Sequence, residues 1–506
     1  MRTHLAITLL AGTCSVRGAW GETLSDWTRS TSRNANCCSI LGDELPGKII
    51  ISGAKDFNAS VDPYWSAQAE AVKPACVVLP ESAEDVSKAI KILSAAARLG
   101  SEACKFAIRS GGHTPDADAA NIQGGVTINL AGLNTVTPAE DRSYVSVGPG
   151  NRWEDVYRVL DPQNLTVVGG RSRTVGVGGL VLMGGMSFFS PRVGLPCANV
   201  LNFEVVLASG EIVNANIQEN PDLYKALKGG INNFGVVTRL DLKALEQGAF
   251  WGGVANWAPE DLPALFDHFE AFASSDGYDE FAQLTLLYGW VYGGEVVMGH
   301  IHYTKPEPFP ATFENFTEVV KPASETFRIE HLTNFTVELE STGDGKSQRL
   351  FTTATFKNSA VMNRRFYELA TTTARDLNGT DGLLFIVSAQ PFNQVIISKA
   401  NETGGTFQGL DEEDGDLMIY CLTIQWDNEA DNAKVSGIVE DLMDKAEAVA
   451  KEIGVFNEYI FPNYAAVWQD PIAGYGEANV AELRAIAGKY DPSQLFQMAV
   501  PGGFKL

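Results

Sequence analysis

Basic side chains are scarce in this chain of 506 residues, which has 38 Lys and Arg against 62 Asp and Glu. The formal net charge is −24 at pH 7. Because like charges repel over long distances, so acidic a surface disfavours nucleic acid and anionic membranes as partners. A bound phosphate group would need local positive potential from backbone N–H groups and an arginine.

Long apolar runs are also scarce, and none after the first residues reaches the roughly 18 that span a bilayer. The chain opens with Arg2 and then an apolar run from Leu5 to Gly12, which has the length of a secretory signal core. We therefore expect a signal peptide at residues 1–21, no membrane anchor, and a secreted, extracellular protein.

Cysteine is limited to seven residues, of which six remain once Cys14 leaves with the signal peptide. An even number suits an oxidising compartment. Four crowd the front of the mature chain and are expected to form two disulfides: Cys37, Cys38, Cys76 and Cys104. Cys197 and Cys421 are equally compatible with a bridge and with free thiols. Six Asn-x-Ser/Thr sequons also favour export, at Asn58, Asn164, Asn315, Asn334, Asn378 and Asn401.

The sequence offers no metal-ligand spacing. His300 and His302 share one face of an expected strand, but no cysteine or carboxylate pattern nearby completes a site. We expect a half-exposed pair of histidines and no metal.

The front of the chain predicts a strand, a helix and a second strand. Ser82 begins a capping box, and apolar residues recur at helical spacing until Gly100. Short β-type runs at 75–80 and 105–109 flank this helix.

From 111 to 237 the chain changes to short β-type runs separated by glycine-rich turns. The segment 169–185 holds seven glycines, too many for ordinary core because each is costly to order and packs nothing. Two helices are expected here, one starting at Asn151 and one with Asn220 as N-cap and Pro221 at its first position.

After about residue 246 the runs lengthen and alternate, which predicts an antiparallel sheet mixed with helices. The expected strands include 283–287, 295–303, 383–389 and 417–426.

A motif whose residues suit ligand binding or catalysis follows the second expected strand, at Arg109-Ser110-Gly111-Gly112-His113-Thr114. Paired glycines let backbone amides approach a ligand, the arginine adds a fixed cation, and a neutral histidine offers a nucleophilic nitrogen. The alternative is a histidine that only hydrogen-bonds a turn.

This motif resembles the flavin-attachment motif of FAD-linked oxidoreductases of the vanillyl-alcohol-oxidase/p-cresol-methylhydroxylase (PCMH) superfamily, in particular its berberine-bridge-enzyme-like branch, which includes fungal oxygen-dependent enzymes. The resemblance runs in family order from about residue 70 to the C-terminus. Its other motifs are Val147-Gly148-Pro149-Gly150, Gly169-Gly170, Thr174 to Gly179, Gly184-Gly185, Gly229 to Val237, Pro462-Asn463-Tyr464 and Lys489 to Pro492.

The resemblance implies that FAD is the cofactor and that a single covalent bond joins His113 to the 8α carbon of the flavin. A neutral imidazole can add to that carbon once the methyl group has lost a proton. The other cofactor-binding residues that it implies are Arg109, Ser110, Gly111, Gly112, Thr114, Gly148, Gly150, Gly170, Thr174, Val175, Gly176, Gly178, Gly179, Gly185, Gly230, Asn233, Gly235, Val237 and Asn463. The glycines would turn backbone N–H groups toward the pyrophosphate and ribityl chain. Gly176-x-Gly178 alone would suggest a nicotinamide dinucleotide fingerprint, but that motif is incomplete.

Two positions of this match concern reactivity. Doubly linked relatives carry a cysteine where this chain has Ser172, and a hydroxyl is the weaker nucleophile, so single attachment is expected. Val175 corresponds to a gate on the flavin face where a small residue favours access of O2; ordinary packing would also explain a valine.

Tyr464 is the first candidate catalytic residue, because the family's Asn-Tyr pair approaches the flavin from the substrate side. A tyrosine donates a proton or, when ionised, accepts one; a buried structural tyrosine is the alternative. Tyr420 and Gln390 are further candidates, since a sheet that faces the flavin directs alternate side chains toward it.

We therefore predict an α+β fold with a two-part, PCMH-type FAD-binding domain closed by the C-terminal tail, and an antiparallel-sheet substrate domain. The expected divisions are the signal peptide at 1–21, an N-terminal segment at 22–69, the FAD-binding domain at 70–245, the substrate domain at 246–455, and a C-terminal segment at 456–506 that completes the FAD domain.

The expected activity is dehydrogenation of a small-molecule substrate by hydride transfer to flavin N5, with O2 as acceptor, by a monomer of fungal secondary metabolism. A secreted carbohydrate or aromatic-alcohol oxidase is one alternative, and a non-catalytic flavin-binding glycoprotein is another.

Overall fold

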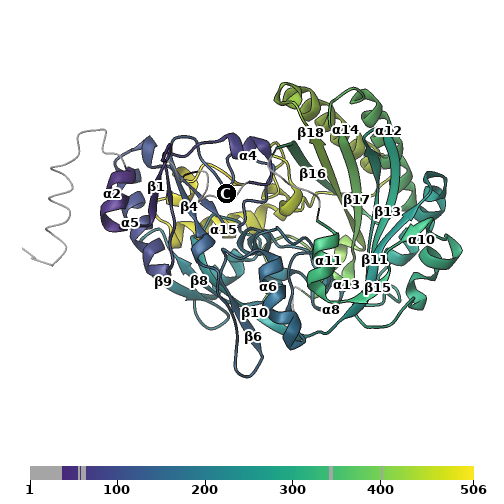
Figure 1. Ribbon diagram of the computed structural model, residues 1–506, viewed down its shortest axis with the longest axis horizontal. Helices are drawn as coiled ribbons and strands as arrows, with labels where there is room; N and C mark the ends of the chain where they lie inside the picture. Colours follow the sequence, from purple (N-terminus) through teal and green to yellow (C-terminus); the bar gives the residue numbers. More distant parts are fainter. Residues whose placement is uncertain (1–36, 55–56, 58–63, 341–345, 400–402) are drawn as a thin grey trace, which may run out of the picture.

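The computed structural model describes residues 37–54, 57, 64–340, 346–399 and 403–506. The expected signal peptide and the sequons at Asn58 and Asn401 lie outside these residues. Figure 1 shows two lobes, one built from the purple, blue and yellow parts of the chain and one from the green part.

The first lobe begins with a four-stranded sheet in the order β1-β2-β4-β3. Its strands are β1 (Ile49–Ile51), β2 (Cys76–Val78), β3 (Phe106–Arg109) and β4 (Val126–Asn129). Helix α5 (Ala83–Arg98) starts where the Ser82 hydroxyl accepts the N–H of Asp85, and its buried face includes Val86 and Leu93. The capping box and the apolar spacing therefore predicted this unit correctly.

The second sheet of this lobe is antiparallel, in the order β5-β6-β10-β8-β9, with β7 on the side of β10. Its strands are β5 (Val136–Pro138), β6 (Tyr144–Val147), β7 (Leu165–Val167), β8 (Val200–Val206), β9 (Ile212–Ala215) and β10 (Val236–Glu246). Helices α6 (Trp153–Leu160) and α9 (Pro221–Leu227) lie where expected. Asn220 has a positive φ of 50° and makes no side-chain cap; instead its amide donates to the carbonyl of Asn214 at 2.7 Å.

The second lobe is a nine-stranded sheet in the order β14-β11-β13-β12-β17-β18-β16-β19, with β15 beside β11. Its long strands are β11 (Phe250–Trp257), β12 (Ala282–Val291), β13 (Gly294–Tyr303), β16 (Gln348–Lys357), β17 (Leu384–Phe392) and β18 (Leu417–Trp426), and its short ones are β14 (Ser324–Glu325), β15 (Arg328–Glu330) and β19 (Phe456–Asn457). The strands of this sheet pair antiparallel throughout the described residues, which confirms the predicted antiparallel sheet.

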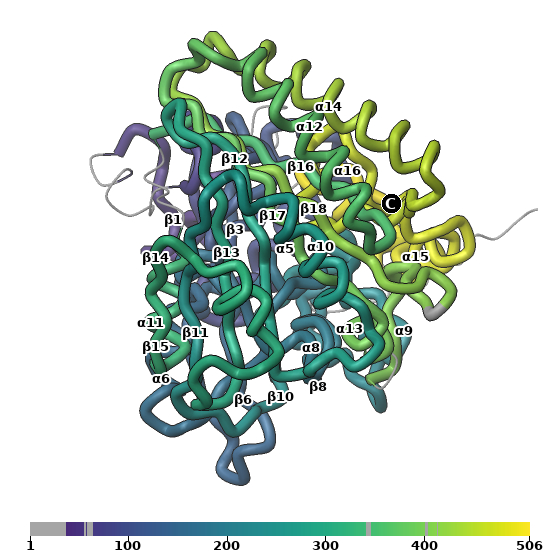
Figure 2. Tube along the Cα trace, turned by 90° about the vertical axis from the view of Figure 1, so that its right-hand side faces the viewer, coloured from purple at the N-terminus to yellow at the C-terminus, as the bar shows by residue number. Residues whose placement is uncertain are grey.

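Helices α10 (Leu262–Ala273), α12 (Ala360–Asp376) and α14 (Asn432–Glu452) cover one face of this sheet, with α12 and α14 side by side (Figures 1 and 2). Side chains that alternate along β18, such as Leu422 and Ile424, are fully buried in the core beneath them. The other face of the sheet is turned toward the first lobe.

The N-terminal segment is fastened to the first lobe by two cysteine pairs. Helix α2 (Cys37–Glu44) carries Cys37, paired with Cys104, and Cys38, paired with Cys76. Cys197 and Cys421 are buried free thiols.

The end of the chain returns to the first lobe, where its yellow ribbon runs among purple and blue elements (Figure 1). Helices α15 (Glu477–Tyr490) and α16 (Leu495–Met498) lead to a tail whose Phe504 carbonyl accepts the amide of Asn233 at 3.0 Å. Leu495, Phe496 and Val500 are buried in the core around α5.

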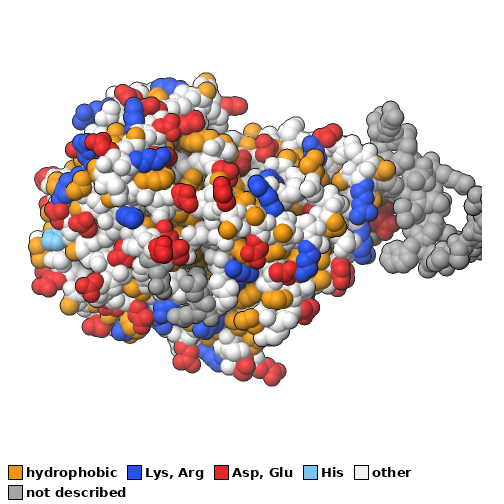
Figure 3. Space-filling model, turned by 180° about the vertical axis from the view of Figure 1, so that it is seen from behind, with side chains coloured by type: hydrophobic (Ala, Val, Ile, Leu, Met, Phe, Trp, Pro, Cys, Tyr) orange, Lys and Arg blue, Asp and Glu red, His pale blue; other side chains and the backbone are white. Residues whose placement is uncertain are grey.

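Among the described residues, no helix is long and apolar enough to cross a membrane. Acidic and basic side chains are interspersed over the face shown in Figure 3.

Candidate active site

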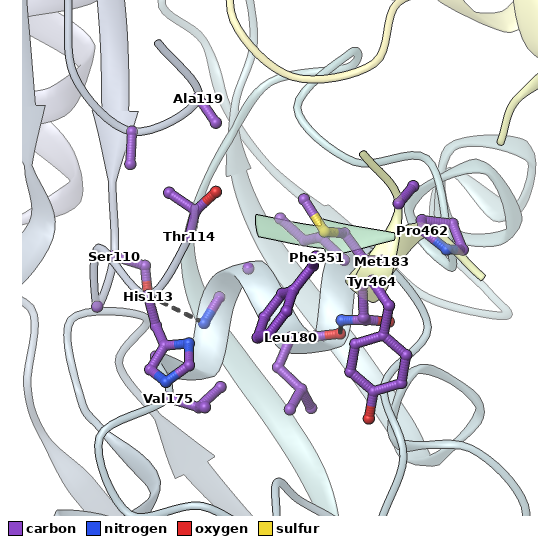
Figure 4. Close-up of a pocket in the computed structure, with 18 of the residues that line it drawn as sticks. Ser110, His113, Thr114, Ala119, Val175, Leu180, Met183, Phe351, Pro462 and Tyr464 are labelled. Atoms are coloured by element: carbon purple, nitrogen blue, oxygen red, sulfur yellow. Dashed lines mark hydrogen bonds between the residues drawn. The ribbon is translucent and has the colours of Figure 1, made fainter. Parts of the chain in front are cut away.

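A cavity of about 370 Å³ is lined by residues of both lobes. The first lobe supplies the loop after β3 and the glycine-rich segment, and the nine-stranded sheet supplies side chains from its uncovered face. In Figure 4, His113 and Tyr464 lie on opposite sides of this cavity.

The His113 imidazole is stacked on Trp65, with ring centroids 4.4 Å apart and an angle of 21° between the planes. Burial lowers the pKa of His113 to about 3, and the charges of Arg349 and Arg152 act in the same direction. The ring is therefore neutral at pH 7. Its Nε2 is buried and has no hydrogen-bond partner among the described residues.

Backbone forms much of the surface beside His113. A Cβ on Gly176 would lie 2.3 Å from the nitrogen of Gly111, and one on Gly111 would lie 2.6 Å from the Cα of Gly176. Only glycine permits this contact. The Ser110 hydroxyl accepts the N–H of Gly178 at 3.2 Å and donates to the carbonyl of Pro149. The first of these bonds connects the loop after β3 with the glycine-rich segment (Figure 4).

The cofactor-binding residues that we predicted fall into two groups. Those that line the cavity are Ser110, Gly111, Gly112, His113, Thr114, Val175, Gly176, Gly178, Gly179, Gly235, Val237 and Asn463. Those that do not line it are Arg109, Gly148, Gly150, Gly170, Thr174, Gly185, Gly230 and Asn233.

The second group lies behind the cavity surface and supports it. The Arg109 guanidinium carbon lies 3.9 Å from the ring centroid of Tyr64. A Cβ on Gly150 or Gly230 would lie 2.0 Å from a backbone oxygen, that of Leu130 or Ala226. At Gly150 and Gly230 the backbone is therefore packed so closely that only glycine fits.

The sheet contributes one continuous face to the cavity. Ser388 pairs with both Leu287 and Cys421 across neighbouring strands, and Thr285 pairs with His300. All five line the cavity. Burial lowers the pKa of His300 to about 3 and raises that of the Cys421 thiol to about 12, so both side chains are neutral at pH 7.

Gln390 lines the cavity as predicted, whereas the position predicted for Tyr420 is wrong. The Tyr420 hydroxyl donates to Asn363 on α12 at 2.7 Å, and its ring stacks on Phe366. Side chains alternate between the faces of a strand, so Tyr420 faces the helices and its neighbour Cys421 faces the cavity.

The expected half-exposed histidine pair is also corrected. His302 is fully buried, and its ring centroid lies 4.4 Å from that of Phe188 and 4.9 Å from that of Phe335. No group of three or more His, Cys, Asp or Glu in the described parts of the chain is arranged to hold a metal ion.

Tyr464 ends a short 3₁₀ turn, Pro462–Tyr464, that is fixed to the glycine-rich segment by Asn463. The Asn463 side chain accepts the N–H of Gly185 at 2.9 Å and donates to the carbonyl of Leu180 at 3.1 Å. The Tyr464 hydroxyl oxygen accepts a hydrogen bond from Arg171 at 3.2 Å.

Sequence reasoning missed two charged residues at this site. Arg171 lines the cavity, and Glu340 binds the loop that carries it by accepting the hydroxyls of Ser172 at 2.7 Å and Thr174 at 2.6 Å. The signal for Arg171 was its place directly after Gly169-Gly170. Glu340 comes from the second lobe and left no local signal.

The residues present fit a flavin. A neutral histidine with a free, buried nitrogen stands beside a backbone surface that side chains would fill, and the cavity is large enough for a ring system between this surface and the sheet.

Comparison with known proteins identifies an FAD-binding region in the first lobe. Residues 74–216 match the FAD binding domain family. The chain is 35% identical over 502 residues to an FAD-dependent monooxygenase of Cercospora beticola, covering 96% of this chain and 94% of that relative. It is 36% identical over 502 residues to an FAD-dependent monooxygenase of Fusarium proliferatum, covering 96% of each.

Solved structures share the fold at low identity. A xylooligosaccharide oxidase from Myceliophthora thermophila gives a TM-score of 0.76 at 19% identity, covering 93% of this chain and 100% of that one. A glucooligosaccharide oxidase from Acremonium strictum with a 6-S-cysteinyl, 8α-N1-histidyl FAD gives 0.75 at 16% identity, covering 92% and 98%. The chain therefore belongs to the FAD-linked oxidoreductases, in the family of the fungal FAD-dependent monooxygenases, and it shares its fold with carbohydrate oxidases.

Proposed function

We propose that this enzyme dehydrogenates a small organic substrate in fungal secondary metabolism, with FAD attached covalently to His113 and O2 as the electron acceptor. The observation that carries the proposal is the position of His113 and Tyr464 on opposite sides of one cavity (Figure 4). The flavin, when bound, supplies a hydride acceptor at N5 that O2 can reoxidise.

Attachment at His113 is supported by its neutral ring and its unpartnered Nε2. Stacking on Trp65 fixes the plane of the imidazole, which limits the directions from which a new bond can form. Single attachment is supported by Ser172, whose hydroxyl is already directed to Glu340.

Proton transfer is assigned to Tyr464. Its oxygen accepts from Arg171, so its own proton can be directed to a substrate oxygen, and in its ionised form the same oxygen accepts a substrate proton. Gln390 lines the same part of the cavity and positions the substrate through its amide.

Acceptance of electrons by O2 is supported by Val175, a small side chain on the cavity surface. The names of the relatives offer a second candidate, monooxygenation, in which one oxygen atom enters the product. Reaction under ¹⁸O2 separates the two: an oxidase releases labelled peroxide and leaves the product unlabelled.

Secretion is part of the proposal. It is supported by the signal-like opening of the sequence and by the two cysteine pairs, which suit an oxidising compartment. Expression of the full chain in a fungal host should deliver the protein to the medium.

The decisive first experiment is an absorption spectrum of the purified protein before and after acid precipitation. A yellow pellet supports covalent FAD, a yellow supernatant supports FAD without the bond, and a colourless preparation contradicts the proposed function. Peroxide release on a panel of phenols, aromatic acids, alcohols and sugars then tests turnover.

A further inference from the structure

Arg171 brings a positive charge into the cavity, and this charge has no role in the proposed function so far. It is half-buried on the loop after β7 and donates to three neutral acceptors. These are the side-chain oxygen of Gln390, the hydroxyl of Tyr464 at 3.2 Å and the hydroxyl of Thr285 at 3.2 Å. The guanidinium is therefore fixed between the turn Pro462–Tyr464 and the nine-stranded sheet.

These contacts hold the guanidinium but do not balance its charge. No ion pair of Arg171 is present among the described residues, although the chain carries a net charge of −24. A guanidinium has five N–H groups, and these contacts engage three of them.

The carboxylate of Glu340 binds the same loop, but it accepts the hydroxyls of Ser172 and Thr174 and forms no ion pair with Arg171 among the described residues. The side chains that face Arg171 from the sheet are neutral. His300 faces the cavity as neutral imidazole and Cys421 as neutral thiol, and the other sheet residues on this face are hydroxyl, amide or apolar side chains. Among the described residues, Asp116 is the acidic side chain that lines the cavity, and it lies on the loop between Thr114 and Ala119, directly after His113 in the chain.

A partly buried charge without a counter-charge is unfavourable, because the protein replaces only part of the hydration that the ion had in water. An anionic ligand oxygen would relieve this cost and would form charge-assisted hydrogen bonds to the guanidinium N–H groups that these contacts leave free. Neutral sugar hydroxyls would leave the charge unbalanced.

We propose that Arg171 binds an anionic oxygen of the substrate, so that the enzyme acts on an organic acid or an acidic phenol. The inference rests on the proposed function, since it assigns the substrate class of the same cavity. An oxyanion at Arg171 lies beside Tyr464 and Gln390, which directs the rest of the substrate along the cavity. Phe351, Phe461 and Leu180 line that space and suit an apolar or aromatic body.

Two pairs of probes with nearly equal shape test the inference. Benzoate is compared with benzamide, and 4-cyanophenol, at a pH where it is ionised, with benzonitrile. Dissociation constants are measured on the purified full-length protein by perturbation of the flavin spectrum and by calorimetry. We expect at least one anion to bind about ten- to a hundred-fold more tightly than its neutral counterpart. The pair that shows the preference tells whether a carboxylate or a phenolate is recognised.

Substitution locates the effect. Arg171→Gln should abolish the preference for the anion while changing the affinity for the neutral probe less than about threefold. Arg171→Lys, which keeps the charge but loses the planar fork, should retain part of it. Arg173→Gln is the matched control, because Arg173 lies two residues along, pairs with Glu154 at 3.5 Å and does not line the cavity.

Equal binding of anion and neutral probe by the wild type would overturn the inference, as would a preference that survives Arg171→Gln or disappears in Arg173→Gln. If the protein is yellow but binds anion and neutral probe equally, only the role of Arg171 is contradicted, and the proposed function is not affected. A colourless protein contradicts the proposed function, and calorimetry still reports the preference in that case.

Discussion

His113 is the residue to which we propose that FAD is attached. In His113→Ala we expect FAD to be released by acid precipitation, because the ring nitrogen that would hold it is gone. Turnover should fall as well, since the tether no longer orients the flavin. Wild type treated in parallel is the control, and a mutant pellet that stays yellow would place the attachment elsewhere.

Tyr464 and Tyr420 allow a paired test of the catalytic assignment. Tyr464→Phe removes a hydroxyl that faces the cavity and should lower the rate of flavin reduction by about 10²- to 10⁴-fold without releasing the cofactor. Tyr420→Phe removes one that binds Asn363 behind the sheet, so it should cost about 1 kcal/mol of stability and leave the rate unchanged. Stopped-flow reduction under anaerobic conditions measures both, and equal rates for the two variants would remove Tyr464 from the mechanism.

The orientation of Tyr420 also shows what the sequence can and cannot predict for a single residue. The alternation along 417–426 predicted a strand, but it did not say which face meets the flavin, and Tyr420 was assigned to the wrong one. The register with Ser388 decides the question, and that register depends on pairing between strands far apart in sequence.

At the scale of elements, the glycine-rich segment lines part of the cavity, and its glycines differ in how closely they are packed. Gly176 is in contact with the backbone of Gly111, whereas a Cβ on Gly179, in helix α7 (Val177–Leu182), would meet nothing within 4 Å. We expect Gly176→Ala to destabilise the fold by about 2 kcal/mol or more.

Gly179→Ala is the matched control and should leave stability unchanged or slightly improved, because alanine favours helix. Denaturant unfolding measures both. A Gly179→Ala protein that folds normally but retains less flavin would identify Gly179 as a direct contact of the cofactor. Equal stability of the two variants would refute the close packing of Gly176.

The pairing of α2 with the first sheet gives a second prediction for an element. Replacing Cys37 and Cys104 together with serine opens a bridge that spans 67 residues. The free energy of unfolding should fall by roughly 2–4 kcal/mol, mainly because the unfolded chain gains freedom.

Non-reducing peptide mapping of the wild type should show the two bridges Cys37–Cys104 and Cys38–Cys76. Four free thiols, or the crossed connectivity, would contradict the pairing. In the unfolding measurement, Cys197→Ser is the control for replacing a buried cysteine with serine, because the Cys197 thiol is not bridged.

For the whole molecule, the contacts that close the cavity are those that the sequence could least reveal. Local capping and periodicity predicted α5 and most strands, and the family match predicted the return of the C-terminus. The contacts of Arg171 with Thr285, Gln390 and Tyr464 span up to 293 positions along the chain. Such contacts follow from how the two lobes meet, and no local pattern encodes them.

Buried neutral histidines predict how the stability of the whole fold depends on pH. Burial holds the pKa of His302 well below its usual value of 6.5. Below about pH 6.5 the unfolded chain therefore takes up a proton that the folded protein refuses, and the free energy of unfolding falls as the pH falls. The contribution of His302 is complete above about pH 6.5 and declines by about 1.4 kcal/mol per pH unit below it.

Replacing His302 with leucine isolates this contribution. The side chain lies among Phe188, Phe250 and Phe335, and both of its ring nitrogens lack partners in the described part of the chain, so an apolar residue of similar size suits the site. Between about pH 6.5 and about pH 5, the stability of His302→Leu should fall less steeply than that of the wild type, by about 1.4 kcal/mol per pH unit. Urea unfolding at several pH values measures the slopes. Phe335→Leu disturbs the same cluster without removing a titrating group, so it should lower stability at every pH and keep the wild-type slope. If His302→Leu also keeps that slope, the His302 imidazole is protonated in the folded protein and is not the neutral, buried ring described above.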